Sequence, residues 1–198
     1  FHYIAWREIA NDLGFDLTHA QNEQLKGVSR MESLDIILAI GNVTLDEVTK
    51  LQLAAKKNEH YLQLCQQMTP KDVLPGVKPF LDALQRASIR VGLGSASKNA
   101  RLILEHIDML DYFETIVDGN RITKGKPDPE TFLLGANDLE IEPADCVVFE
   151  DAVAGVQAAK AGNMKAVGVG DPAILTDADI VISSFLDIDI KTLRILFV

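Results

Sequence analysis

The residues whose types and spacing could do chemistry form three short segments, and one of them is the acidic pair Glu150-Asp151. This pair directly follows the apolar run Cys146–Phe149. Such a run is typical of a buried parallel strand, and ligands bind beyond the carboxyl ends of strands in open α/β sheets. Adjacent carboxylates there repel each other unless a cation lies between them, and Mg²⁺ prefers oxygen ligands. The pair therefore predicts a metal site, although an acid before a helix is also a good N-cap without any metal.

A second segment, Ser95–Asn99, follows the β-rich run 89–94 and precedes a helical pattern. Small hydroxyl groups, exposed backbone N–H groups, a helix N-terminus and Lys98 together can bind an anion. Without a ligand, Ser97 or Asn99 would be a helix cap and Lys98 a solvated side chain. The clustering of these groups at a strand end favours phosphate.

The third segment is Lys124–Pro129, which leads into another predicted helix. Asp128 suits a cap and Pro129 suits a first helical position. Neither role explains Lys126, which would lie at the same end of the sheet as the acidic pair. A lysine there can neutralise a phosphate or a nucleophilic carboxylate as a point charge. Lys124 is expected to be solvated.

The elements that must position these segments alternate from residue 77 onward. We expect helices over residues 77–87, 99–107, 129–139, 153–161 and 188–196, and strands over 89–94, 115–117, 146–149, 165–169 and 180–182. Alternation of this kind predicts a doubly wound parallel sheet with right-handed crossovers. Pro70, Pro75 and Gly76 mark a boundary before it, so residues 69–198 are expected to form an α/β core domain.

Residues 1–68 have only helical patterns, which predict a small helical bundle. Three capping boxes are expected to open its helices: Thr18 with Gln21, Ser29 with Glu32, and Thr44 with Glu47. In the first helix, residues 1–13, we expect a shared buried face of Ile4, Ala5, Ile9 and Leu13.

Composition excludes several kinds of partner. The formal net charge of -10 argues against non-specific nucleic-acid binding, which needs a basic surface. Cys65 and Cys146 lie far apart in apolar contexts and are expected to be reduced core residues of a cytoplasmic protein. No stretch resembles a signal peptide or is long and apolar enough to span a membrane. We therefore expect a cytoplasmic protein with neither a membrane nor a nucleic-acid partner. We also expect a monomer, although the sequence does not determine the oligomeric state.

Taken in order, these segments resemble the haloacid dehalogenase superfamily of phosphotransferases. The matching residues are Gly94-Ser95, Lys126–Pro129, Glu150-Asp151, Gly155 and Ala159–Gly162. The resemblance implies a doubly wound parallel sheet core with an inserted helical-bundle cap domain. It also implies that Glu150 and Asp151 hold Mg²⁺ while Ser95 and Lys126 contact the transferring phosphoryl group.

Within that superfamily the chain is similar to the β-phosphoglucomutase branch, whose members interconvert β-D-glucose 1-phosphate and glucose 6-phosphate through an aspartyl-phosphate and a bisphosphate intermediate. The similarity implies that His2 orients the general acid/base. It implies that the phosphorylated sugar is bound by Gly27, Val28, Arg30, Lys57, Ser97, Lys98 and Asn99. From the residues alone, Arg30 could be a plain first-turn residue, His2 an ordinary helix residue and Lys57 a solvated one.

The sequence departs from the superfamily at one motif. Members carry Asp-x-Asp-Gly at the end of the first core strand, where the first Asp is the nucleophile and the second is the general acid/base. The 198 residues contain no such motif. We expect it, with the first core strand, in a segment preceding Phe1. A sugar-phosphate phosphatase remains an alternative, as does a catalytically dead fragment or binding protein, but a phosphatase needs only one phosphate site and this sequence predicts two.

Overall fold

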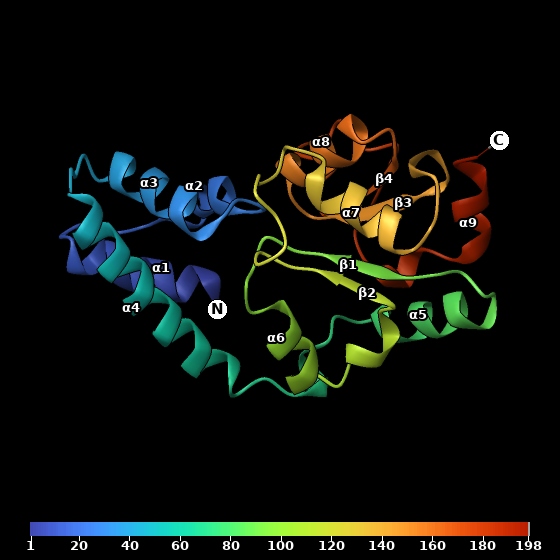
Figure 1. The fold of residues 1–198 in the computed structure, drawn as a ribbon, viewed down its shortest axis with the longest axis horizontal. Coiled ribbons are helices and arrows are strands. Elements are labelled where there is room, and N and C mark those ends of the chain that lie inside the picture. Colours follow the sequence, from blue (N-terminus) through green and yellow to red (C-terminus); the bar gives the residue numbers. More distant parts are fainter. Residues whose placement is uncertain (198) are drawn as a thin grey trace.

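The structure is a computed structural model that describes residues 1–197, and it has two lobes (Figure 1). The first lobe, the cap, contains only helices: α1 (His2–Asp12), α2 (His19–Asn22), α3 (Arg30–Ile40) and α4 (Glu47–Cys65), with a 3-10 turn at Glu23–Leu25. Its core is an apolar cluster in which Trp6 and Ile9 of α1 pack against Leu34 and Ile37 of α3. The predicted helical bundle is therefore present.

Two of the three predicted capping boxes open cap helices as expected. Thr18 caps α2 and Ser29 caps α3, each with its reciprocal side-chain partner. The third was wrong, because Asp46 rather than Thr44 is the N-cap of α4 and accepts the Thr49 N–H at 2.9 Å. An Asp one residue from the helix is as good a cap as Thr.

The buried face of α1 also differs from the prediction. Ala5, Trp6, Ile9 and Ala10 are buried, whereas Ile4 is 48% exposed. Trp6 has the larger apolar surface, so its burial turns the helix face away from Ile4.

The second lobe, the core, is an α/β domain with parallel strands. Its strands are β1 (Gly92–Gly94), β2 (Thr115–Val117), β3 (Val147–Glu150), β4 (Lys165–Val169) and β5 (Ile180–Ile182). Its helices are α5 (Val77–Arg86), α6 (Ala100–His106), α7 (Glu130–Asp138), α8 (Val153–Ala161) and α9 (Ile190–Ile195).

Alternate residues of the strands face two different apolar clusters. In β3, Phe149 packs in the cluster that contains Phe80 of α5 and Leu193 of α9, while Val148 packs in the cluster with Val156 of α8. Helices therefore cover both faces of the sheet, which is the predicted doubly wound α/β class. The described helices include none that is long and apolar enough to cross a membrane.

Two strands differ from the expected ones, β1 at its start and β3 at both ends, where it begins at Val147 rather than at residue 146. β1 begins at Gly92 rather than at residue 89, because β2 offers it a ladder of only three residues, Thr115–Val117. β3 runs one residue further than expected, since Glu150 pairs with Gly168 of β4. The first acid of the pair is therefore held by the sheet itself.

The strands form two small sheets rather than one. β1 pairs with β2, and β3 pairs with β4, which pairs with β5. Among the described strands, β1 and β3 thus each have a neighbour on one side only. Leu93 of β1 and Phe149 of β3 nevertheless share an apolar cluster, so the two free edges belong to one core.

Candidate active site

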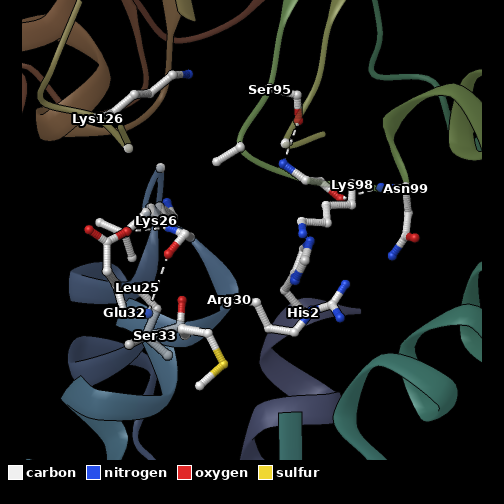
Figure 2. A pocket seen from close by; sticks show the side chains of 18 of the residues that line it. His2, Leu25, Lys26, Arg30, Glu32, Ser33, Ser95, Lys98, Asn99 and Lys126 are labelled. Atoms are coloured by element: carbon white, nitrogen blue, oxygen red, sulfur yellow. Dashed lines mark hydrogen bonds between the residues drawn. The ribbon is translucent and has the colours of Figure 1, made fainter. Parts of the chain in front are cut away.

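A single cavity of about 930 Å³ lies between the cap and the core. Every residue to which the sequence assigned a role lines it. Figure 2 shows Ser95, Lys98, Asn99 and Lys126 on the core side and His2 from the cap on the other side. The structure therefore brings together groups from segments that are far apart in the sequence.

A buried ion pair joins two of the predicted segments at the carboxyl ends of the strands. The Lys126 ammonium contacts the Glu150 carboxylate, and the two residues are 5% and 8% exposed. Glu150 also accepts the Ala152 N–H at 3.1 Å, and a Cβ on Gly155 would overlap its carboxylate. The ammonium lies 4.6 Å from the Phe132 ring centroid. The carboxylate and the ammonium are thus held in fixed positions, a pairing that the sequence analysis did not predict.

The second acid is in a different environment. The Asp151 side chain is 67% exposed, and one of its oxygens lies 3.8 Å from the Lys26 ammonium of the cap. The part of the chain that the structure describes has no group of three or more His, Cys, Asp or Glu side chains that could hold a metal ion. Glu150 and Asp151 still fit a divalent cation, because Mg²⁺ in proteins is often held by one or two carboxylates with water and substrate phosphate.

The Ser95–Asn99 loop is folded by its own hydroxyl groups. Ser95 Oγ accepts the Ser97 N–H at 3.1 Å, and Ser97 Oγ accepts the Asn99 N–H at 3.2 Å. Asn99 is the N-cap residue of α6, but its side chain makes no capping hydrogen bond. Its amide instead donates to Asn58 Oδ1 in the cap at 2.8 Å. Lys98 is exposed toward the cavity.

Arg30 occupies the first position of α3 and faces the cavity from the cap. Its Nη2 donates to Asn58 Oδ1 at 2.7 Å, and no described carboxylate forms an ion pair with it. The loop before α3 reaches the core at Gly27, which has φ +77° and whose added Cβ would lie 3.3 Å from the Ala152 Cβ. Val28 lies beside it on the cavity wall.

His2 and Lys57 form a pair at the base of the cap, in which Lys57 is buried and the His2 residue keeps exposed surface. The Lys57 Nζ and His2 Nδ1 atoms are 2.8 Å apart, and the His2 ring stacks on Tyr61 with centroids 4.0 Å apart. Lys57 is 2% exposed, so the reading of Lys57 as a solvated residue was wrong. Its ammonium lies 4.5 Å from the Tyr61 ring centroid and 4.7 Å from that of Trp6.

The environment of this pair changes both protonation equilibria. Burial, and then the charge of Lys57, lowers the pKa of His2 to about 3. Burial, and then the charge of Arg30, lowers the pKa of Lys57 to about 7. His2 is therefore neutral at pH 7. When Lys57 is protonated its ammonium can only donate, so that Nδ1 of His2 is then the acceptor and Nε2 carries the proton. The spacing of Ala54, Lys57, Tyr61 and Cys65 along α4 was the available signal for this burial.

The lowered pKa of Lys57 predicts a pH dependence of stability. The unfolded chain keeps the Lys57 proton up to its ordinary pKa of 10.5, whereas the folded chain loses it near 7. Between these values the unfolded state binds more protons, so the free energy of unfolding should rise with pH across this window. Urea unfolding at pH 7 and pH 9.5 should show this rise in the wild type and a smaller rise in Lys57→Met.

Lys56→Met is the matched control, because Lys56 is the exposed neighbour that pairs with Asp12 at 2.6 Å. This variant should keep the wild-type rise. An equal rise in the wild type and Lys57→Met would contradict the lowered pKa.

Comparison with known proteins identifies the family. A profile of the haloacid dehalogenase-like hydrolases matches residues 2–163. The chain belongs to the haloacid dehalogenase-like hydrolase family. It is 40% identical over 196 residues to a β-phosphoglucomutase of Bacillus subtilis, covering 98% of this chain and 87% of the relative.

Other relatives include both a mutase and a phosphatase. The crystal structure of a β-phosphoglucomutase from Clostridium difficile is similar with a TM-score of 0.94 and 39% identity, over 99% of this chain and 89% of that one. A fructose-1-phosphate phosphatase of Escherichia coli is 33% identical over 168 residues, or 85% of this chain and 87% of the relative. The predicted superfamily and fold are confirmed, and membership of the family implies a divalent metal ion.

Proposed function

We propose that this chain is the cap and most of the core of a β-phosphoglucomutase, which interconverts β-D-glucose 1-phosphate and glucose 6-phosphate. The observation that carries the proposal is that one cavity is lined by two groups of side chains, each of which could bind a phosphate. One lies on the core side at Ser95 and Lys126, and the other lies where Arg30 faces Lys98 and Asn99. A substrate that carries a phosphoryl group at either end in turn needs both. The 40% identity to a β-phosphoglucomutase supports the same activity.

On the core side, we propose that Glu150 and Asp151 hold Mg²⁺. When bound, this ion would supply positive charge to the oxygens of the transferring phosphoryl group. Ser95 would donate a hydrogen bond to that group. Lys126 would add its charge and keep the Glu150 carboxylate oriented, which is the kind of fixed electrostatic environment on which phosphoryl transfer depends.

We place the nucleophilic aspartate and the acid/base aspartate in a segment outside these 198 residues, since they contain no Asp-x-Asp-Gly. The free edges of β1 and β3 support this placement, because a parallel strand between them would end beside Ser95 and Glu150. The neutral His2 ring is held by Lys57 and can donate from Nε2 to a carboxylate there. The aspartyl-phosphate and the bisphosphate intermediate would form at this end of the cavity.

On the cap side, Arg30, Ser97, Lys98 and Asn99 would bind the phosphate that is not transferred. Gly27 and Val28 would contact the sugar through their backbone groups, and Lys57 would approach it from α4. Closure of the cap would exclude water and let the intermediate turn around before the second transfer.

A sugar-phosphate phosphatase is the second candidate, favoured by the identity to a fructose-1-phosphate phosphatase. We propose further that the protein works in the cytoplasm as a monomer. Both described cysteines, Cys65 and Cys146, are free thiols, and one chain supplies the whole cavity described here.

The test is to incubate the full-length protein with β-glucose 1-phosphate, a trace of glucose 1,6-bisphosphate and Mg²⁺. We expect glucose 6-phosphate to form faster than inorganic phosphate is released, and EDTA to abolish both. Release of phosphate without glucose 6-phosphate would instead support the phosphatase. If neither product forms, the chain is a non-catalytic binding protein.

A further inference from the structure

One side chain to which the sequence assigned no role links the two lobes beside the second phosphate place. Asn58 lies on α4, and its Oδ1 accepts two hydrogen bonds, from Arg30 Nη2 at 2.7 Å and from Asn99 Nδ2 at 2.8 Å. Arg30 begins α3 in the cap, while Asn99 precedes α6 in the core. A single amide oxygen therefore links three elements, α3, α4 and the N-terminus of α6.

The charges around this oxygen are unusual for a protein with a formal net charge of -10. Arg30 has no carboxylate partner among the described residues, and its charge helps to lower the pKa of the neighbouring Lys57. The Asn58 oxygen orients the guanidinium without neutralising it. A carboxylate at the same position would accept the same hydrogen bonds but would cancel the charge that an anion needs.

We infer that Asn58 is a positioning residue that presets Arg30 and Asn99 for the phosphate that is not transferred, and that its neutrality is required for this role. The inference rests on the proposed function, because it concerns the second phosphate place of the same cavity. Asn58 acts through its two hydrogen-bond donors and need not touch the substrate.

The test compares Asn58→Ala with Asn58→Asp in the full-length protein. The probes are glucose 1,6-bisphosphate, which needs both phosphate places, and phenyl phosphate, which needs one. Binding is measured by calorimetry without divalent cation, so that no turnover accompanies it. We expect the Kd of the bisphosphate to rise about 10-fold in Asn58→Ala, from lost orientation, and about 100-fold in Asn58→Asp, from the added pairing of Arg30.

The order of the two variants separates this role from a purely structural one. Asp keeps both acceptor bonds, so a structural role would make Asn58→Asp the milder change. The controls Gln63→Ala and Gln63→Glu repeat both changes at an exposed amide on the same helix and should bind as the wild type does.

Three results would overturn the inference: Asn58→Asp binding the bisphosphate as well as or better than Asn58→Ala, both variants binding like the wild type, or phenyl phosphate weakening equally. A wild type that prefers the bisphosphate no more than phenyl phosphate would instead contradict the proposed function. Thermal unfolding of each variant shows that the fold is retained.

Discussion

Lys126→Met is expected to lower the free energy of unfolding by about 3–5 kcal/mol, because it leaves the buried Glu150 carboxylate without its partner. Both residues of the pair are buried. The Glu150 carboxylate packs directly against Gly155, where a Cβ would overlap it. Turnover should fall by a factor of about 100 to 1,000, the usual effect of removing one fixed group that stabilises transition-state charge. Urea unfolding measures the first effect, and conversion of β-glucose 1-phosphate measures the second.

The chain offers a matched control two residues away. The Lys124 side chain is 70% exposed and pairs with Asp128 at 3.4 Å, so Lys124→Met should change stability by less than about 0.5 kcal/mol. The double variant Lys126→Met/Glu150→Gln removes both buried charges and should recover most of the lost stability but none of the activity. If the double variant is as unstable as Lys126→Met, the unpaired carboxylate is not the cause of the loss.

Arg30→Ala is expected to reduce the mutase kcat/KM by a factor of about 10 to 100, the value of a hydrogen-bonded charge to a phosphate. Hydrolysis of phenyl phosphate should stay within about twofold of the wild type, because one phosphate place suffices for it. The mutase kcat/KM of Arg30→Lys should lie between those of the wild type and Arg30→Ala, since lysine keeps the charge and loses the planar fork of donors. Parallel steady-state assays of both substrates measure the split.

Arg7→Ala is the control for loss of a cap arginine. Arg7 pairs with Asp16 at 2.6 Å on the outer surface, where its side chain is 48% exposed, and it does not line the cavity. Both activities should remain unchanged in this variant. Equal losses in mutase and phenyl phosphate turnover on Arg30→Ala would rule out a role for Arg30 at the second phosphate place.

The sequence was informative wherever a local pattern decides the structure. Strand 165–169 and helix 153–161 have the predicted limits, because apolar runs and flanking small residues are local signals. The pairing of Lys126 with Glu150 could not be predicted in this way. The pairing depends on how the loop that carries Lys126 lies relative to the end of β3. The residues between Lys126 and Glu150 do not indicate this arrangement.

Lys57 shows a different kind of error. Its charge suggested a solvated face, but its position at helical spacing from Ala54 and Tyr61 places it on the buried side of α4. A long aliphatic stem and two aromatic rings make this burial possible. The bridge from Asn58 to Asn99 had no local signal at all, because it exists only when the cap lies against the core.

The start of α1 and the end of α4, which are the two ends of the cap, lie side by side. The His2 ring at the start of α1 stacks on Tyr61, one turn before α4 ends at Cys65 and the chain enters the core. The loop joining α2 to α3 meets the core on the opposite edge, at Gly27 (Figure 1). We expect a rotation of the cap about this shared end to separate Gly27 from Ala152 before it strains the hydrogen bonds of Asn58. Sugar phosphates would then enter and leave past the acidic pair rather than past α4.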